Sequence, residues 1–118
     1  MHKTVLVVED DPGLREVIAE ILLLDGYEVL TAGDGLEAIE VLRERQPSVI
    51  LLDMMMPRMD GFAFAAEAQR LGIQIPTIVL TADNRARQKA EQVGAVSYLE
   101  KPFAIPSLLE AVGRFAVN

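Results

Sequence analysis

Acidic side chains follow two apolar runs of the sequence, where they could bind a metal ion. Glu9, Asp10 and Asp11 come directly after one run, and Asp53 comes directly after another. Carboxylates held close together repel one another, and a hard divalent cation is the simplest remedy. Mg²⁺ takes oxygen ligands, usually one or two carboxylates together with waters and a phosphate. Asp10 and Asp53 are therefore candidate ligands of Mg²⁺.

A hydroxyl and an amine follow two further expected strands. Thr81 comes after residues 77–80, and Lys101 comes after residues 96–100. A cation would let an anionic phosphoryl group approach Asp53, while the amine and the hydroxyl bind other phosphoryl oxygens. Phosphoryl transfer needs chiefly positioning and charge neutralisation, and carboxylates are known acceptors. These groups predict phosphoryl transfer to Asp53, provided that the fold brings them together.

The fold class follows from apolar runs and amphipathic stretches that alternate five times. The expected strands are 5–8, 28–32, 49–52, 77–80 and 96–100, and helices are expected to begin near Pro12, Leu36, Phe62, Arg85 and Pro106. Asp11 before a proline predicts a helix cap, and Asp60 beside a glycine predicts a cap or turn. Five such units predict an α/β domain with a mostly parallel sheet and helices on both faces.

The order of the strands is predicted from their polarity. The runs 5–8, 49–52 and 77–80 are apolar throughout except for Thr77, which is typical of buried central strands. The strands 28–32 and 96–100 include polar residues, which indicates edges. This favours a flavodoxin-like (βα)5 doubly wound parallel sheet with the order 2-1-3-4-5. Ligands bind such sheets at the carboxyl ends of the strands where the order reverses, which is where the acids are expected.

Composition limits the functions that remain. The 118 residues fit a single domain spanning 1–118, either a stand-alone protein or a domain of a longer one. Of these residues 51% are hydrophobic, enough for a core. The net charge of -7 argues against direct nucleic-acid binding. No apolar run reaches the roughly 18 residues of a membrane span, and no signal peptide is recognised. The absence of cysteine fits a reducing compartment. We therefore expect a cytoplasmic protein.

The segments that carry these groups resemble the receiver domain of bacterial two-component response regulators. The resemblance covers essentially the whole chain. The matching segments are 5–11, 52–57 with 59–61, 80–82 and 98–103. Any one of these segments is a weak signal, but all of them in this order and spacing are highly specific.

The resemblance implies a role for each acidic residue. Asp53 is the expected phosphoacceptor. Asp10, Asp53 and the backbone carbonyl of Met55 are the expected ligands of Mg²⁺, for which Mn²⁺ could substitute. Glu9 is expected to act through a metal-bound water.

The resemblance also implies a conformational switch. Lys101 is expected to contact the phosphoryl group and to precede Pro102 through a cis peptide bond. The Thr81 hydroxyl moves toward the phosphoryl group, and the ring of Tyr98 turns inward. The face built from the fourth helix, the fifth strand and the fifth helix then changes its partner preferences. Phosphorylation adds about -1.5 to -2 charges, and it shifts the two conformations only if it interacts better with one.

The implied partners are a sensor histidine kinase or a histidine phosphotransfer protein, together with an output domain or target that is not identified. A homodimer through the switch face is a further arrangement that the resemblance allows. The residues Val96 and Ser97 stand where DNA-binding regulators often carry two aspartates, which weakens the case for that subfamily. The domain is expected to catalyse only its own phosphorylation and slow dephosphorylation, so it is not an enzyme in the usual sense.

Three alternative functions would each require a different arrangement of residues or a different use of this one. A flavin-binding electron carrier would need a phosphate cradle of Gly, Ser and Thr after the first strand, where this chain has acids. An aspartyl phosphatase of the haloacid dehalogenase type would carry its acceptor in an Asp-x-Asp motif after that strand. Here the acceptor candidate Asp53 follows the third strand, and no Asp stands two residues after it. A receiver-like adaptor that acts by protein binding without phosphorylation remains as the alternative.

Overall fold

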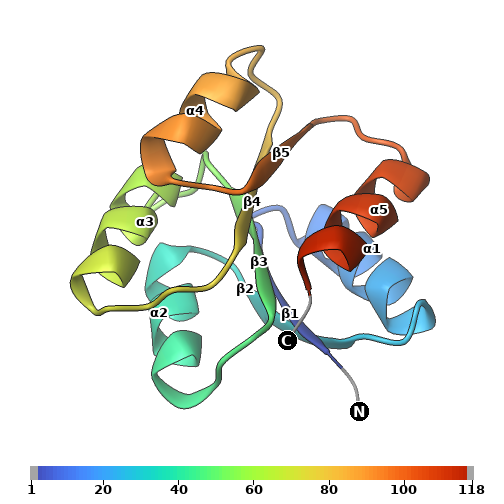
Figure 1. Cartoon of the computed structure of the whole chain (residues 1–118), viewed down its shortest axis with the longest axis horizontal. Coiled ribbons are helices and arrows are strands. Elements are labelled where there is room, and N and C mark those ends of the chain that lie inside the picture. Colours follow the sequence, from blue (N-terminus) through green and yellow to red (C-terminus); the bar gives the residue numbers. More distant parts are fainter. Residues whose placement is uncertain (1–2, 117–118) are drawn as a thin grey trace.

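The computed structural model describes residues 3–116. His2, the only histidine of the sequence and a residue to which the sequence assigns no role, lies outside the described residues. Within that range the chain forms five strands and five helices in strict alternation (Figure 1). The strands are β1 (Thr4–Val8), β2 (Glu28–Ala32), β3 (Val49–Asp53), β4 (Thr77–Thr81) and β5 (Ser97–Glu100). The helices are α1 (Pro12–Leu24), α2 (Gly35–Glu44), α3 (Gly61–Arg70), α4 (Ala86–Val93) and α5 (Ile105–Phe115).

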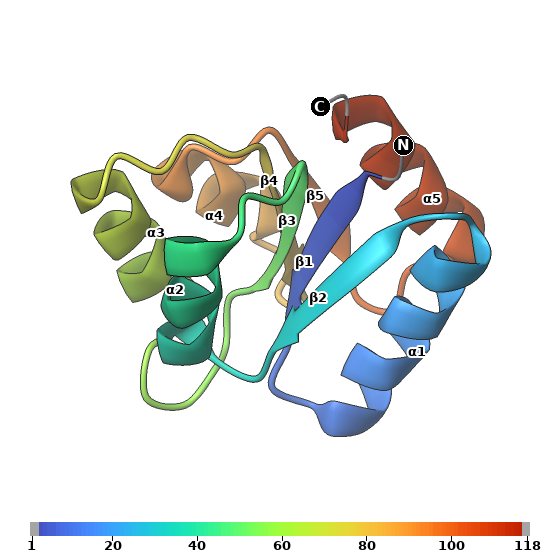
Figure 2. The same cartoon turned by 90° about the horizontal axis from the view of Figure 1, so that it is seen from below.

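The strands form one parallel sheet in the order β2-β1-β3-β4-β5. This confirms the flavodoxin-like order predicted from strand polarity, with β2 and β5 at the edges. Figure 2 shows α1 and α5 on one face of the sheet, and α2, α3 and α4 on the other. The order reverses between β1 and β3, so the predicted ligand position lies at the carboxyl ends of these two strands.

The first strand shows why the central strands are continuously apolar. Leu6 and Val8 pack in the core beneath α2, α3 and α4, whereas Val5 and Val7 pack in the core beneath α1 and α5. All four side chains are fully buried. Because successive side chains point to opposite faces, a strand covered on both faces needs apolar residues at every position.

Aspartates begin the helices that follow the functional strands. The carboxylate of Asp11 accepts a hydrogen bond from the backbone N–H of Gly13 at 3.0 Å, and Asp60 accepts one from Ala63 at 2.9 Å. Both caps confirm the sequence prediction. They satisfy backbone donors that have no partner in the first turn of a helix.

The boundaries of the elements lie within about one residue of those predicted. The fifth strand begins at Ser97, because Val96 joins the sheet only through its backbone N–H to the Thr77 carbonyl at 2.9 Å. The fourth helix begins at Ala86, with Arg85 in the capping position outside the helix. None of the helices between residues 3 and 116 has the length and apolar character that a membrane-spanning segment needs.

Candidate functional site

The acidic site forms where β1 and β3 end side by side. Val8 pairs with Leu52 across these strands. The next residue along each chain segment is Glu9, just after β1, and Asp53, the last residue of β3. One carboxylate oxygen each from Glu9, Asp10 and Asp53 can be chosen so that all three lie within 4.8 Å of one another. The structure therefore brings together the acids that the sequence placed at this edge.

Two of these acids are buried and the third is exposed. Glu9 is 1% exposed and Asp53 is 3% exposed, while Asp10 faces solvent. Burial raises the pKa of Asp53 to about 8, and hydrogen bonding to Asp10 and Glu9 adds to the rise. The hydrogen bond from Asp53 in turn lowers the pKa of Asp10. Without a cation, the cluster therefore retains a proton near neutral pH.

This donor set fits Mg²⁺. The cluster offers hard oxygen ligands, and its excess negative charge is strong enough to hold a proton on Asp53. A divalent cation would take the place of that proton, because metal ligands must be deprotonated. The exposed position of Asp10 leaves the site open to solvent. Met55 donates its backbone N–H to Asp53 Oδ1 at 3.2 Å, and its expected role as a carbonyl ligand stays a prediction.

Lys101 reaches the acids from the loop after β5. Its Nζ donates a hydrogen bond to Glu9 Oε1 at 2.6 Å and lies 3.5 Å from Asp53 Oδ1. Burial by itself lowers the pKa of Lys101, but the hydrogen bond to Glu9 and the charge of Asp53 outweigh it and raise that pKa. The Lys101–Pro102 peptide bond is cis, the conformation that the resemblance implies. The amine is therefore a permanent cation beside the acids.

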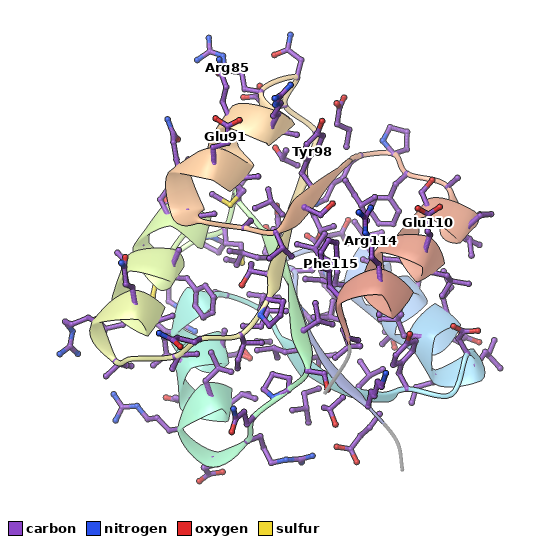
Figure 3. The ribbon with its side chains drawn as sticks, in the orientation of Figure 1. Arg85, Glu91, Tyr98, Glu110, Arg114 and Phe115 are labelled. Atoms are coloured by element: carbon purple, nitrogen blue, oxygen red, sulfur yellow. The ribbon has the colours of Figure 1, made fainter. Side chains whose placement is uncertain are left out.

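Thr81 ends the neighbouring strand and is buried. Its hydroxyl oxygen accepts a hydrogen bond from the backbone N–H of Asp83 at 3.1 Å, which ties it to the β4–α4 loop. Tyr98 on β5 is 38% exposed and lies between α4 and α5 (Figure 3). These positions are compatible with the expected switch, whose movement stays a prediction.

Two charged pairs near the site were missed by the sequence reasoning. Arg58 pairs with Asp34, which joins the β3–α3 loop to the β2–α2 loop. Lys89 on α4 pairs with Asp83 at 3.2 Å, beside Thr81. The partners of the first pair lie 24 positions apart, and no local pattern connects them. The one available signal was Asp34 before a helix, which is typical of an N-cap.

The sequence matches one protein family and several characterised relatives. The sequence model described as "Response regulator receiver domain" matches residues 5–113. The chain is 39% identical over 111 residues to response regulator MprA of Mycobacterium ulcerans, covering 92% of this chain and 48% of that protein. It is 38% identical to MprA of Mycobacterium tuberculosis with the same coverage. The chain thus spans about half the length of these relatives.

Several solved structures share this fold over nearly the full length of the chain. The receiver domain of Francisella response regulator 1452 matches with a TM-score of 0.90 and 31% identity, covering 98% of this chain and 97% of that one. Chemotaxis response regulator CheY4 of Vibrio cholerae matches with a TM-score of 0.89 and 33% identity over 98% and 99%. The receiver domain of sensor histidine kinase PA1611 from Pseudomonas aeruginosa, solved with magnesium coordinated in its active-site cleft, has a TM-score of 0.89, 30% identity and full coverage of both chains.

Proposed function

This chain belongs to the response regulator receiver family, and on that premise we propose that Asp53 accepts the phosphoryl group in a Mg²⁺-dependent reaction. The supporting observation is the surroundings of this carboxylate. It is buried, it shares a cluster of oxygens within 4.8 Å with Glu9 and Asp10, and its Oδ1 lies 3.5 Å from the Lys101 ammonium. A buried carboxylate between anionic and cationic groups is suited to accept an anion once a metal is bound.

The proposed reaction is an in-line transfer from a phosphohistidine. An oxygen of Asp53 forms a bond to phosphorus, and the nitrogen–phosphorus bond breaks with its electron pair returning to the imidazole ring. Bound Mg²⁺ would neutralise charge on the carboxylates and on the phosphoryl oxygens. Asp10, Asp53 and the Met55 carbonyl would hold it, and Glu9 would act through a water. Mn²⁺ could take its place. Lys101 would shift from Glu9 toward a phosphoryl oxygen.

The phosphorylated state would be read through the switch pair. Thr81 would exchange its hydrogen bond from Asp83 for one that it donates to a phosphoryl oxygen, since a hydroxyl both donates and accepts. Tyr98 would then turn inward and alter the α4–β5–α5 face. This gives the phosphoryl group the differential contacts that a population shift requires.

The α4–β5–α5 face suits a protein partner. Arg85 and Glu91 lie on the α4 side of Tyr98, and Glu110 and Arg114 lie on the α5 side (Figure 3). Charges of both signs around an exposed aromatic ring favour a specific contact with another protein. A homodimer, an output domain or a separate target are the candidate partners for this face.

The wider assignment follows the family. We expect one receiver domain over residues 1–118, cytoplasmic, which receives its phosphoryl group from a sensor histidine kinase or a histidine phosphotransfer protein. It would catalyse only its own phosphorylation and slow dephosphorylation. The matches lend no support to a receiver-like adaptor that is never phosphorylated.

Incubation with acetyl phosphate and Mg²⁺, followed by intact mass measurement, tests the proposal. The wild-type chain should gain one phosphoryl group, and a chelator or Asp53→Asn should prevent the gain. Asp60→Asn is the matched control, because an amide can still cap α3 and the residue lies outside the acidic cluster. Labelling that persists in Asp53→Asn would place the acceptor elsewhere. A wild-type chain that never labels would favour the adaptor.

A further inference from the structure

A charged pair fastens the loop after the phosphoacceptor to a neighbouring loop. Arg58 Nε donates a hydrogen bond to Asp34 Oδ2 at 2.6 Å, and a terminal nitrogen of the same guanidinium also contacts that oxygen. One residue along each loop, the backbone N–H of Gly35 donates to the carbonyl of Met59 at 3.1 Å. Two consecutive residues of the β3–α3 loop are thus held against two consecutive residues of the β2–α2 loop.

The contact is tightly built. Asp34 is only 5% exposed although it is charged, and its other oxygen accepts from the Glu37 backbone N–H at 2.9 Å to cap α2. A Cβ at Gly35 would lie 2.6 Å from Met59 Cγ and 2.7 Å from its carbonyl oxygen, so the two backbones approach as only glycine allows. Arg58 has a φ of 62°, a left-handed conformation that disfavours a side chain. The pair with Asp34 compensates for this unfavourable backbone.

The same loop is anchored to the acidic site at its other end. The Met55 backbone N–H donates to Asp53 Oδ1 at 3.2 Å, and the Gly61 N–H donates to the Met54 carbonyl at 3.3 Å. The carbonyl of Met55 therefore lies on a short segment that is held at Asp53 on one side and at Arg58 on the other. Freeing the Arg58 end would leave that carbonyl to be ordered when the metal binds.

We propose that the Arg58–Asp34 pair is a positioning device that holds the Met55 carbonyl in place for Mg²⁺, so that metal affinity depends on two residues outside the acidic cluster. The inference rests on the proposed function, which makes that carbonyl a ligand. Groups that orient a metal ligand contribute to affinity without touching the metal. The guanidinium side chain is 58% exposed, so its truncation should loosen the loop at residue 58 without removing core packing.

Electrostatics alone would give a different pattern from positioning. Removing the positive charge of Arg58 should strengthen Mg²⁺ binding if only charge mattered, whereas removing the negative charge of Asp34 should weaken it. Positioning predicts that both changes weaken binding. Asp34→Asn is suitable for this comparison because an asparagine oxygen can still cap α2 while the ionic bond to Arg58 is lost.

Isothermal titration of the whole chain with MgCl₂ tests the proposal without any phosphorylation. We expect Arg58→Ala and Asp34→Asn each to weaken Mg²⁺ binding by about tenfold, and the double variant to be no weaker than either single variant. Arg45→Ala is the matched control, since it removes a surface arginine paired with Glu28 at the opposite end of the sheet. It should bind Mg²⁺ as the wild type does.

The outcomes separate this inference from the proposed function. Wild-type or stronger Mg²⁺ binding by Arg58→Ala overturns the positioning role, while phosphoryl labelling of the wild-type chain would still stand. A wild-type chain that binds no Mg²⁺ overturns both. Thermal unfolding without metal shows whether each variant is folded. If Arg58→Ala fails to fold, the Mg²⁺ affinities of Asp34→Asn and Arg58→Gln test the proposal instead. Weaker Mg²⁺ binding in both variants supports positioning, and stronger Mg²⁺ binding in Arg58→Gln overturns it.

Discussion

The ammonium of Lys101 donates its hydrogen bond to Glu9 Oε1 at 2.6 Å, whereas Asp53 Oδ1 lies 3.5 Å from the same nitrogen. The cation thus rests on the buried acid beside the proposed acceptor. The ammonium partly neutralises the negative charge of Glu9 and Asp53, which would otherwise attract a metal ion. A phosphoryl group on Asp53 would be a stronger partner for the amine. On phosphorylation, Lys101 would therefore have to weaken or break its hydrogen bond to Glu9.

Replacing Lys101 by methionine should raise Mg²⁺ affinity and slow phosphorylation. Removing a cation beside Glu9 and Asp53 leaves more negative charge for the metal, and we expect roughly tenfold tighter binding, or about 1.4 kcal/mol. The acceptor would lose the group that neutralises a phosphoryl oxygen, so labelling by acetyl phosphate should be slower. Calorimetry and timed mass spectra measure the two effects, with Lys3→Met as the control for charge. Weaker Mg²⁺ binding would show that the lysine orients Glu9 more than it competes with the metal.

Mg²⁺ binding should strengthen as pH rises from 6 to 8. Burial raises the pKa of Asp53 to about 8, so the metal must displace a proton in this range. If one proton is released, affinity rises by up to about tenfold per pH unit below that pKa. Titration in two buffers of different ionisation enthalpy measures the released proton. Asp53→Asn should lose the dependence. A wild-type affinity that is constant from pH 6 to 8 would contradict the raised pKa.

The same pKa has a consequence for stability without metal. An unfolded aspartate titrates near 3.9, so between about pH 4 and pH 8 the folded chain holds a proton that the unfolded chain has released. Stability contributed by this group is therefore fully present below about pH 4 and declines as pH rises toward 8. Urea unfolding at pH 5 and pH 8 should show the decline for the wild type, and saturating Mg²⁺ should reduce it. For Asp53→Asn, the urea concentrations at the midpoint of unfolding should differ less between pH 5 and pH 8.

Thr81→Ala should separate phosphorylation from its readout. The acceptor and the metal ligands remain, so the variant should still gain one phosphoryl group. Without the hydroxyl, the phosphoryl group has no partner at the end of β4, and Tyr98 should not follow. In a Tyr27→Phe background Tyr98 is the sole tyrosine, and the chain has no tryptophan, so tyrosine fluorescence reports on it alone. Thr81→Ser should retain the change. A full fluorescence change in Thr81→Ala would remove the hydroxyl from the switch.

The fold was largely predictable because hydrophobic pattern and strand polarity depend on neighbouring residues. Uninterrupted apolar runs identified the central strands, and polar residues in 28–32 and 96–100 identified the edges. Parallel strands then bring their following residues to one edge, which is why Asp10, Asp53 and Lys101 could be expected to meet. The start of β5 at Ser97 was missed because the last hydrogen bond at the edge of the sheet, from the Val96 N–H to the Thr77 carbonyl, determines where the strand begins.

Pairings between loops could not be predicted in the same way. Whether Lys101 bonds to Glu9 or to Asp53 depends on side-chain rotamers and on differences of about 1 Å (compare 2.6 and 3.5 Å), which no sequence pattern encodes. The Arg58–Asp34 pair depends on a left-handed backbone at an arginine, where sequence rules expect glycine or asparagine. The details that position the site thus depend on tertiary contacts.

Gly61→Ala should disturb the loop after the acceptor, although alanine favours helices. A Cβ at this first residue of α3 would lie 2.5 Å from Met54 Sδ and 2.9 Å from Met54 Cα, and Met54 is fully buried. Sulfur could move, but a backbone carbon cannot move without displacing the loop, so we expect a loss of about 1–3 kcal/mol in the free energy of unfolding. Gly113→Ala in α5 is the matched control, because its Cβ would meet Tyr27 Oη at an ordinary 3.7 Å and should stabilise the helix by about 0.5–1 kcal/mol. Urea unfolding measures both changes. If Gly61→Ala proves as stable as the wild type, the loop yields without cost, and Mg²⁺ titration of the same variant should then show unchanged affinity.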